Sequence, residues 1–500
     1  MKHAVPSVRD HLVPQARSRT RGCGLRACLP DIPGAPLTAT DLATQTPPSG
    51  PETPRRHRTG RWIDHWEPED QAFWEGGGSK VARRNLVWSI LAEHVGFSVW
   101  MLWSASAVYL AQAGFDFTVD QLFWLAAVPS LVGATMRFPY TFAVARFGGR
   151  NWTVVSALLL LVPCTLLVVC VSNPATPYWM FVLAAVTAGL GGGNFASSMA
   201  NISYFYPDAR KGWALGLNAA GGNIGVSTVQ LVTPIVVGVS VVGAASAVNL
   251  ENVALVWAPL ALVAALGAWL FMDNLSSARS PMRDQVRVAK DRQTWVMSFL
   301  YIGTFGSFIG YGAAMPLLMA TQFPEVSGRY AFLGALVGSL VRPLGGLLAD
   351  RWGGARITAV TFLAMGVGVL GVVWSVEAHA FGPFLAAFMV LFTLAGIGNG
   401  TTYRMIPAIF RARVGESDEE RKRARVQSAA ALGVISAIGA YGGFLVPRSF
   451  GVSIANTGGI EAALYGFVLF YAACAGLTWW CYLRSRVLVT RVPSLAHAQV

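Results

Sequence analysis

The 500-residue chain is far more apolar than a soluble protein of its length, with 54% hydrophobic residues, 13% charged residues and a mean hydropathy of +0.49. This composition excludes a soluble enzyme and predicts an all-α protein of the lipid bilayer. The net charge of +13 would fit a nucleic-acid partner, but the basic residues gather in alternate loops between apolar segments. We therefore expect no nucleic-acid partner.

The first 84 residues divide into two segments of different character. Residues 1–60 are rich in Pro, Arg, Thr and Gly, without periodicity and without an apolar signal-peptide core. They predict a disordered basic cytoplasmic tail. Residues 61–84 carry an aromatic cluster and predict an interfacial segment just before the first membrane span. The cluster comprises Trp62, Trp66, Phe73 and Trp74.

Apolar segments long enough to cross about 30 Å of hydrocarbon recur from Asn85 to Leu483. They predict twelve transmembrane helices in two six-helix halves, residues 85–274 and 293–486, joined by a cytoplasmic linker at 275–292. A cytoplasmic tail, 487–500, follows. The expected centres are Phe97, Val132, Leu160, Ala188, Gly225, Leu262, Gly306, Leu340, Gly368, Met389, Ser436 and Phe470.

Basic residues alternate between loops, which predicts the orientation in the membrane. The basic loops would be cytoplasmic, and an even number of spans then places both termini in the cytoplasm, with the chain in the inner cell membrane. The basic residues that define these loops include Arg146, Arg150, Arg210, Lys211, Arg279, Arg283, Arg351, Arg356, Arg411, Arg413 and Arg425, whereas the intervening loops carry chiefly Arg329 and Arg448.

An internal repeat relates Arg137 to Arg342, since 342 − 137 = 205. Each arginine follows a glycine by four residues and precedes a Gly-Gly pair by eleven. A guanidinium is costly at membrane depth, so each marks a candidate functional site. One such cation from each half predicts a shared site at the midplane for a small oxyanion.

Glycine-rich segments repeat as well, and the strings GLGGGN from Gly189 and GIGNG from Gly396 correspond. Glycines at helical spacing make flat faces on which another helix can approach closely. We interpret these faces as sliding contacts between the two halves, with static packing as the alternative. The predicted gating or packing glycines are Gly192, Gly222, Gly225, Gly439 and Gly442.

Two ionisable residues, Glu93 and His94, lie inside the first predicted span. A carboxyl group in an apolar span is costly to leave ionised, which makes Glu93 a candidate proton carrier together with His94. The alternative is a structural carboxylate that pairs with a cation of a neighbouring helix or stays hydrated near the cytoplasmic face.

Longer strings carry a resemblance to known families. The loop GLLADRWGG, from Gly346, resembles the cytoplasmic signature of the major facilitator superfamily. The runs GGGNFASSMANISYFYP from Gly191 and KGWALGLNAAGGNIGV from Lys211 resemble the nitrate signature of the nitrate/nitrite porter family of that superfamily. The runs GIGNGTTYRMIP from Gly396 and GVISAIGAYGG from Gly433 resemble it too.

The resemblance implies a site and a function. The implied substrate-binding residues are Arg137, Arg342, Phe195, Asn223, Tyr301 and Phe305; Arg404 also falls in a family motif, and Ala219 stands where the signature usually has Gly. The implied activity is secondary active transport of nitrate and nitrite by alternating access. We expect nitrate/nitrite exchange; alternatives are proton-coupled nitrate symport and a membrane nitrate sensor. We expect a functional monomer with no cofactor, no metal and no catalytic residues.

Overall fold

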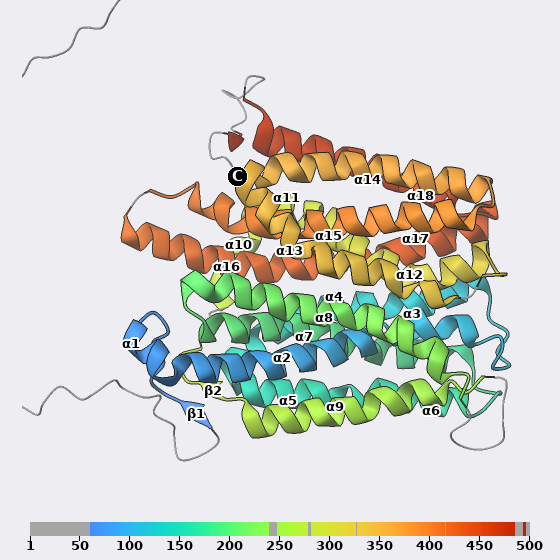
Figure 1. Ribbon diagram of the computed structural model, residues 1–500, viewed down its shortest axis with the longest axis horizontal. Helices are drawn as coiled ribbons and strands as arrows, with labels where there is room; N and C mark the ends of the chain where they lie inside the picture. The colour runs from blue at the N-terminus through green and yellow to red at the C-terminus, as the bar shows by residue number, and fades with distance from the viewer. Residues whose placement is uncertain are drawn as a thin grey trace, which may run out of the picture. The chain divides into compact units, whose positions relative to one another are not determined.

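The computed structural model describes residues 61–239, 248–278, 282–326, 328–415, 417–485 and 494–496. The predicted tail 1–60 and most of the predicted tail 487–500 lie outside the described residues. Within the described part, helices of the N-terminal half and of the C-terminal half form two neighbouring layers (Figure 1). Each layer joins helices that are consecutive in the chain, as the division into two halves predicts.

The N-terminal half contains six membrane-spanning elements. The first is bent by 46° between α2 and α3, and the third is formed by α5 and α6 in succession. The elements are α2 (Ser79–Trp100), α3 (Leu102–Ser106), η2 (Ala107–Tyr109), α4 (Val119–Phe147), α5 (Gly149–Leu159), α6 (Leu161–Val171), α7 (Tyr178–Phe205), α8 (Asp208–Val236) and α9 (Glu251–Phe271).

The C-terminal half repeats this arrangement. Its first span is interrupted by a π-helical turn, η3, a feature frequent at functional sites. The elements are α11 (Arg292–Tyr301), η3 (Ile302–Gly306), α12 (Ser307–Gln322), η4 (Gly328–Tyr330), α13 (Phe332–Trp352), α14 (Gly354–Glu377), α15 (Phe381–Arg411), α16 (Asp418–Ala440), α17 (Gly442–Thr457), α18 (Glu461–Thr478) and η5 (Trp479–Leu483).

Eleven of the twelve expected centres fall within these elements, and the remaining one, Leu160, lies at the junction of α5 and α6 in the third span. The predicted arrangement of two helical halves agrees with the structure. Ten helices of the described residues are long and apolar enough to cross a membrane, and the bent first element makes eleven. The twelfth is α8, which packs along α2 for its length. It carries polar side chains along its length and buries Asn218, Asn223 and Gln230.

The repeated glycine pairs end α4 and α13. Gly148 has φ +86° and Gly353 has φ +87°, backbone conformations that residues with a side chain rarely adopt. Each glycine stops one helix and lets the next begin at once, at Gly149 and Gly354. The start of α4 is fixed by a capping box, in which Thr118 and Gln121 exchange side-chain to backbone hydrogen bonds.

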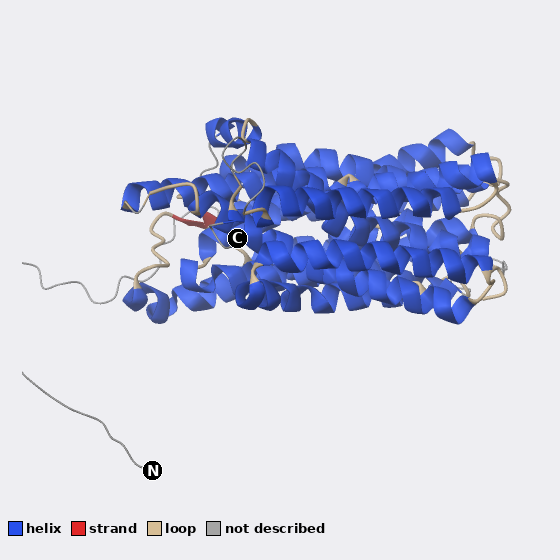
Figure 2. Cartoon of the chain, turned by 90° about the horizontal axis from the view of Figure 1, so that it is seen from above, coloured by secondary structure: helices blue, strands red, loops and turns tan. Residues whose placement is uncertain are grey.

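The segment before α2 folds onto the N-terminal half. A two-stranded parallel sheet pairs β1 (Trp62–Ile63) with β2 (Asn274–Leu275), drawn in red in Figure 2 at the end of the bundle that also carries α1 (Gln71–Phe73), η1 (Trp74–Gly78) and α10 (Met282–Ala289). The predicted interfacial aromatics Trp66, Phe73 and Trp74 are buried there, against side chains that include Phe205 and Tyr206. We call this end of the bundle the basic end, because the basic loops around Arg150 and Arg210 lie beside these elements.

Candidate anion-binding site between the two halves

Arg137 is fully buried in α4 and is bonded to both halves of the protein. Its Nε donates to the carbonyl oxygen of Gly192 in α7 at 3.2 Å, and its Nη1 donates to the carbonyl oxygen of Ser436 in α16 at 2.8 Å. Its Nη2 has no hydrogen-bond partner among the residues that the structure describes. The guanidinium is therefore held firmly, with one donor edge left to offer.

Aromatic rings surround this guanidinium. Its central carbon lies 4.7 Å from the ring centre of Phe195, 5.2 Å from that of Phe305 and 5.6 Å from that of Trp100. Phe195 stacks on Phe305 with centroids 6.3 Å apart, and Tyr301 continues the stack at 5.3 Å from Phe305. The rings form flat walls and exclude water from the cation.

Arg342 lies in α13 on the other half and is held more loosely. Arg342 is 7% exposed, and the central carbon of its guanidinium lies 5.4 Å from the ring centre of Tyr403. Its Nη1 has no partner within the described ranges. The charge of Arg342 repels that of Arg137, and both interact electrostatically with Tyr301. The two cations therefore share one buried region.

Several buried polar atoms in this region lack a hydrogen-bond partner in the part of the chain that the structure describes. They are Arg137 Nη2, Arg342 Nη1, the Tyr301 hydroxyl and both amide atoms of Asn223. Buried polar groups are normally paired, so such orphans call for an explanation. All but the Asn223 oxygen can donate, and two carry positive charge. The group that would satisfy them is a small anion.

The six residues that the family resemblance implies differ in how closely the structure joins them. Five are connected by the ring contacts and charges just described. Asn223 is buried in α8. The preceding residue, Gly222, faces Glu93 and Phe97. Sequence reasoning missed Trp100 and Tyr403, which contact the two guanidiniums. Gly133 packs closely against Trp100, because a Cβ added at Gly133 would lie 2.7 Å from the Trp100 ring. In the sequence, this contact is indicated by nothing more than the glycine itself.

Glu93 and His94 occupy different surroundings. Glu93 is 1% exposed, and its Oε1 accepts a hydrogen bond from Asn194 Nδ2 at 3.1 Å. Its Oε2 has no partner within the described ranges, and its charge interacts with that of Arg137. His94 is half-buried, with Nδ1 3.1 Å from the carbonyl oxygen of Gly221. Because a carbonyl only accepts, Nδ1 carries the proton.

The five predicted glycines lie where helices meet closely. A Cβ added at four of them would come within 2.5 Å of a neighbouring atom, so no larger residue fits without rearrangement. Gly222 leaves slightly more room, with Glu93 Oε2 at 3.2 Å. The four tight contacts are Gly192 with Trp100 at 2.4 Å, Gly225 with the His94 carbonyl at 2.3 Å, Gly439 with Tyr301 at 2.4 Å and Gly442 with Gly306 at 2.3 Å. Each joins two helices of the same half, so these contacts are packing within a half and not the expected sliding contacts between the halves.

Ion pairs join the two halves at both ends of the bundle. At the basic end Arg425 of α16 donates to Asp208 of α8 at 2.6 Å. At the opposite end Arg448 of α17 donates to Asp120 of α4 at 2.8 Å and covers the ring of Trp124. With both arginines of the site buried, this is a closed conformation.

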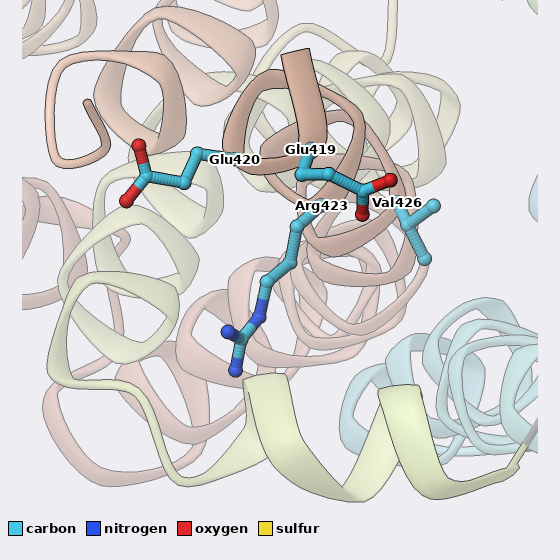
Figure 3. A pocket seen from close by; sticks show the side chains of 4 residues that line it. All are labelled: Glu419, Glu420, Arg423 and Val426. Carbon is cyan, nitrogen blue, oxygen red and sulfur yellow. The ribbon is translucent and has the colours of Figure 1, made fainter. Parts of the chain in front are cut away.

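Two other features lie away from this site. Arg404 is largely exposed and its Nε donates to Asp350 at 2.5 Å. An open surface pocket of about 370 Å³, shown in Figure 3, lies at the start of α16. Its lining residues are Glu419, Glu420, Arg423 and Val426. Neither feature contacts the buried guanidiniums.

Comparison with known proteins finds similarity over most of the chain. Residues 94–430 match the Major Facilitator Superfamily. The nitrate/nitrite transporter NarU of Salmonella typhimurium is 45% identical over 85% of this chain and 96% of its own. The probable nitrate/nitrite antiporter NarK2 of Thermus thermophilus is 36% identical over 85% of this chain and 97% of its own.

Solved structures show the same fold at lower identity. The D-xylose-proton symporter superposes with a TM-score of 0.60 and 15% identity, over 80% of this chain and 97% of its own. A bacterial homologue of the human lysosomal transporter Spinster, inward-facing and unoccupied, superposes with a TM-score of 0.58 and 16% identity, over 80% and 96%. At these identities the likeness concerns the fold.

Proposed function

Since the chain belongs to the nitrate/nitrite porter family of the Major Facilitator Superfamily, we propose that it carries nitrate and nitrite across the membrane by alternating access. The observation that supports this most directly is the group of orphaned donors at Arg137, Arg342 and Tyr301, buried beside stacked rings. Relatives named as nitrate/nitrite transporters at 45% identity agree with a small planar anion. Both arginines come from one chain, which favours a functional monomer.

Nitrate is planar with three equivalent oxygens, so a guanidinium can meet its edge with directed hydrogen bonds. Arg137 Nη2 and Arg342 Nη1 each offer one such donor. Phe195 and Phe305 would restrict the slot to a flat ion and cover its faces. Tyr301 would donate its hydroxyl, and Asn223 its amide N–H, to the remaining oxygens. A bulkier or tetrahedral anion would not fit between parallel rings.

Transport requires that this closed site open to each side in turn. The positive-inside rule assigns the basic end to the cytoplasm and the Asp120–Arg448 end to the outside. Opening at either end would break one of the two ion pairs while the close glycine contacts hold the helices of each half together. The pair that remains would act as the pivot.

The coupling mode that we propose first is nitrate/nitrite exchange. Without an anion, Arg137 and Arg342 repel across a region of low dielectric, which disfavours closure. A bound anion neutralises that repulsion and lets the halves close. A carrier that reorients faster when loaded exchanges one anion for another.

One observation favours proton-coupled nitrate symport as a second candidate. Glu93 is buried next to the anion region, with one carboxylate oxygen unpaired among the described residues. A buried carboxyl group in a membrane span is a natural proton carrier. His94 is a weaker candidate because it donates to a backbone carbonyl.

The test is labelled nitrate uptake into proteoliposomes of the purified protein. Vesicles loaded with nitrite are compared with empty vesicles under an acid-outside pH gradient. Uptake only with internal nitrite supports exchange, whereas uptake driven by the gradient alone supports symport. Binding of nitrate without uptake in either arm would refute transport and favour the sensor.

A further inference from the structure

The surroundings of Glu93 are built from neutral hydrogen-bonding groups. Its Oε1 accepts from Asn194 of α7, and Asn194 is itself fixed because Ser197 donates to its amide oxygen at 2.8 Å. The free Oε2 faces Gly222 of α8, at 3.2 Å from the position a Cβ would take. The carboxyl group therefore has one anchored oxygen and one oxygen able to accept or carry a proton.

A second set of polar groups continues from Glu93 toward the basic end. Ser198 of α7 interacts with the Glu93 carboxyl group and accepts from Asn218 Nδ2 at 2.7 Å. The hydroxyls of Ser198 and Ser89 lie 2.9 Å apart. Ser89 is one turn of α2 closer to the basic end than Glu93. Hydroxyls so linked can pass a proton because each both donates and accepts.

Arg137 is the charged group that faces this carboxyl group. The helices packed against α2 otherwise present neutral groups: amides and hydroxyls from α7 and α8, and alanines from α5 and α9. His94 turns to the carbonyl of Gly221 instead. Asn194, Ser198 and Gly222 lie at the Glu93 carboxyl group, and Asn218 follows behind Ser198. Ala157, Ala264 and Ala265 pack against Ala92, the preceding residue of α2. Within the part of the chain that the structure describes, Arg137 is therefore the charge that balances Glu93, and a proton is the alternative.

We infer that Glu93 and the transported anion alternate as the counter-ion of Arg137. In the empty carrier the Glu93 carboxylate balances Arg137 and relieves its repulsion with Arg342. When nitrate binds, it takes over that balance, and Glu93 Oε2 forms an O–H bond with a proton from solution. When nitrate leaves, the proton leaves along Ser198 and Ser89. The buried charge is the same in both states, so both can reorient. This inference rests on the proposed anion site and on the second coupling mode, proton-coupled symport, in place of exchange.

The consequence is a specific division of activities. When the Glu93 carboxylate is present, the empty carrier can reorient to the outside, and each nitrate enters together with a proton. Without the carboxylate, the two arginines repel in the empty carrier, and only loaded carrier moves. Glu93→Gln should therefore convert a carrier capable of net uptake into an obligatory exchanger, although Glu93 itself does not touch the anion.

The experiment compares two assays on wild type, Glu93→Gln and the matched control Glu377→Gln, an exposed carboxylate at the end of α14. The Glu93→Gln variant should keep nitrate/nitrite counterflow within about twofold of wild type and lose net uptake under an acid-outside gradient by at least about tenfold. Calorimetry in buffers of different ionisation enthalpy should show about one proton taken up per nitrate in wild type and none in the variant.

Several outcomes would overturn the inference. Net uptake and proton stoichiometry that survive in Glu93→Gln would do so, as would loss of counterflow in a variant that remains folded. Where Glu93→Gln fails to fold, Glu93→Asp serves, and an unchanged pH profile of its net uptake would contradict the inference. Nitrate counterflow by wild type is measured in parallel, so failure of the anion site itself is seen separately.

Discussion

The two arginines of the site occupy equivalent positions in the repeat and yet differ in how they are held. Arg137 is fully buried, donates to the carbonyls of Gly192 and Ser436, and lies against three aromatic rings. Arg342 is slightly exposed, lies against the ring of Tyr403, and has its Nη1 unpaired within the described ranges. The clamp is therefore asymmetric, with a fixed jaw in the N-terminal half and an adjustable jaw in the C-terminal half.

The repeat preserves the frame around each arginine rather than its contacts. An added Cβ at Gly133 would meet Trp100 at 2.7 Å, and one at Gly338 would meet Phe308 at 2.8 Å, so both glycines admit an aromatic residue from the first helix of their half. The hydrogen-bond partners differ because they come from other helices. A duplicated helix thus positions a cation, and its neighbours decide how tightly.

The largest effect should follow from loosening the fixed jaw. Arg137→Lys replaces three separately directed nitrogens by one ammonium nitrogen, which cannot reach the Gly192 and Ser436 carbonyls and the anion together. Each lost charge-assisted bond costs about 1.5–3 kcal/mol. Nitrate counterflow in proteoliposomes should fall more than about 100-fold. The control is Arg356→Lys, an exposed arginine at the start of α14. Near-normal counterflow in Arg137→Lys would sink the clamp.

Arg342→Lys should cost less, because no hydrogen bond to a backbone carbonyl is described for Arg342. One directed bond to the anion is lost, which corresponds to about tenfold weaker nitrate binding. Isothermal titration of nitrate measures the change. Equal losses in Arg137→Lys and Arg342→Lys would show that the two jaws act alike, against the asymmetry described above.

Removing the aromatic ring next to Arg137 should weaken nitrate binding more than removing the ring next to Arg342. Phe195→Leu removes the ring closest to Arg137 and should weaken nitrate binding by about tenfold, within the range of about 0.5–2 kcal/mol for a cation on a ring. Tyr403→Leu removes a more distant ring from Arg342 and should cost about threefold. A larger loss for Tyr403→Leu would reverse the assignment of the fixed jaw.

The smallest effects should come from the two ion pairs between the halves. Arg448 is 13% exposed and covers Trp124, whereas Arg425 is 64% exposed. Exposed pairs contribute little, about 0–1 kcal/mol. Arg448→Gln should lower the thermal unfolding midpoint by about 2 °C, and Arg425→Gln should leave it unchanged. Equal shifts of the midpoint in the two variants would show that the difference in burial between Arg448 and Arg425 does not change how much each ion pair stabilises the protein.

Much of this molecule is visible in the sequence, and the reason lies in the membrane. Spans must be about 20 apolar residues long, which is why the expected centres fall inside the spans. A buried guanidinium is so costly that Arg137 and Arg342 stand out without a structure. The span α8, centred on Gly225, is placed among the apolar segments too, although it does not pass the length and hydropathy test that the other spans pass.

The residues that contact Arg137 and Arg342 cannot be predicted from the sequence in this way. The bond from Arg137 to Ser436 joins residues 299 positions apart and ends on a backbone carbonyl, which every residue has. Trp100 and Tyr403 are aromatic residues in apolar helices, where such residues are common. Only the approach of two helices assigns them to the site. The anchored oxygen of Glu93 depends in the same way on Asn194 of another helix.

The small sheet between β1 and β2 bears on how the protein is made. It pairs Trp62 with Asn274, so it closes the N-terminal half upon itself, and Asp273 beside it is fully buried and pairs with Arg84. These contacts exist only after the last helix of that half has been synthesised. All the residues that form them lie before position 276, so these contacts need no part of the C-terminal half, and domains generally fold as units with the N-terminal one first during synthesis. Arg137 gains its bond to Ser436 and its contact with Phe305 only once the second half has been added, so the tight hold on this arginine is a product of assembly between the halves.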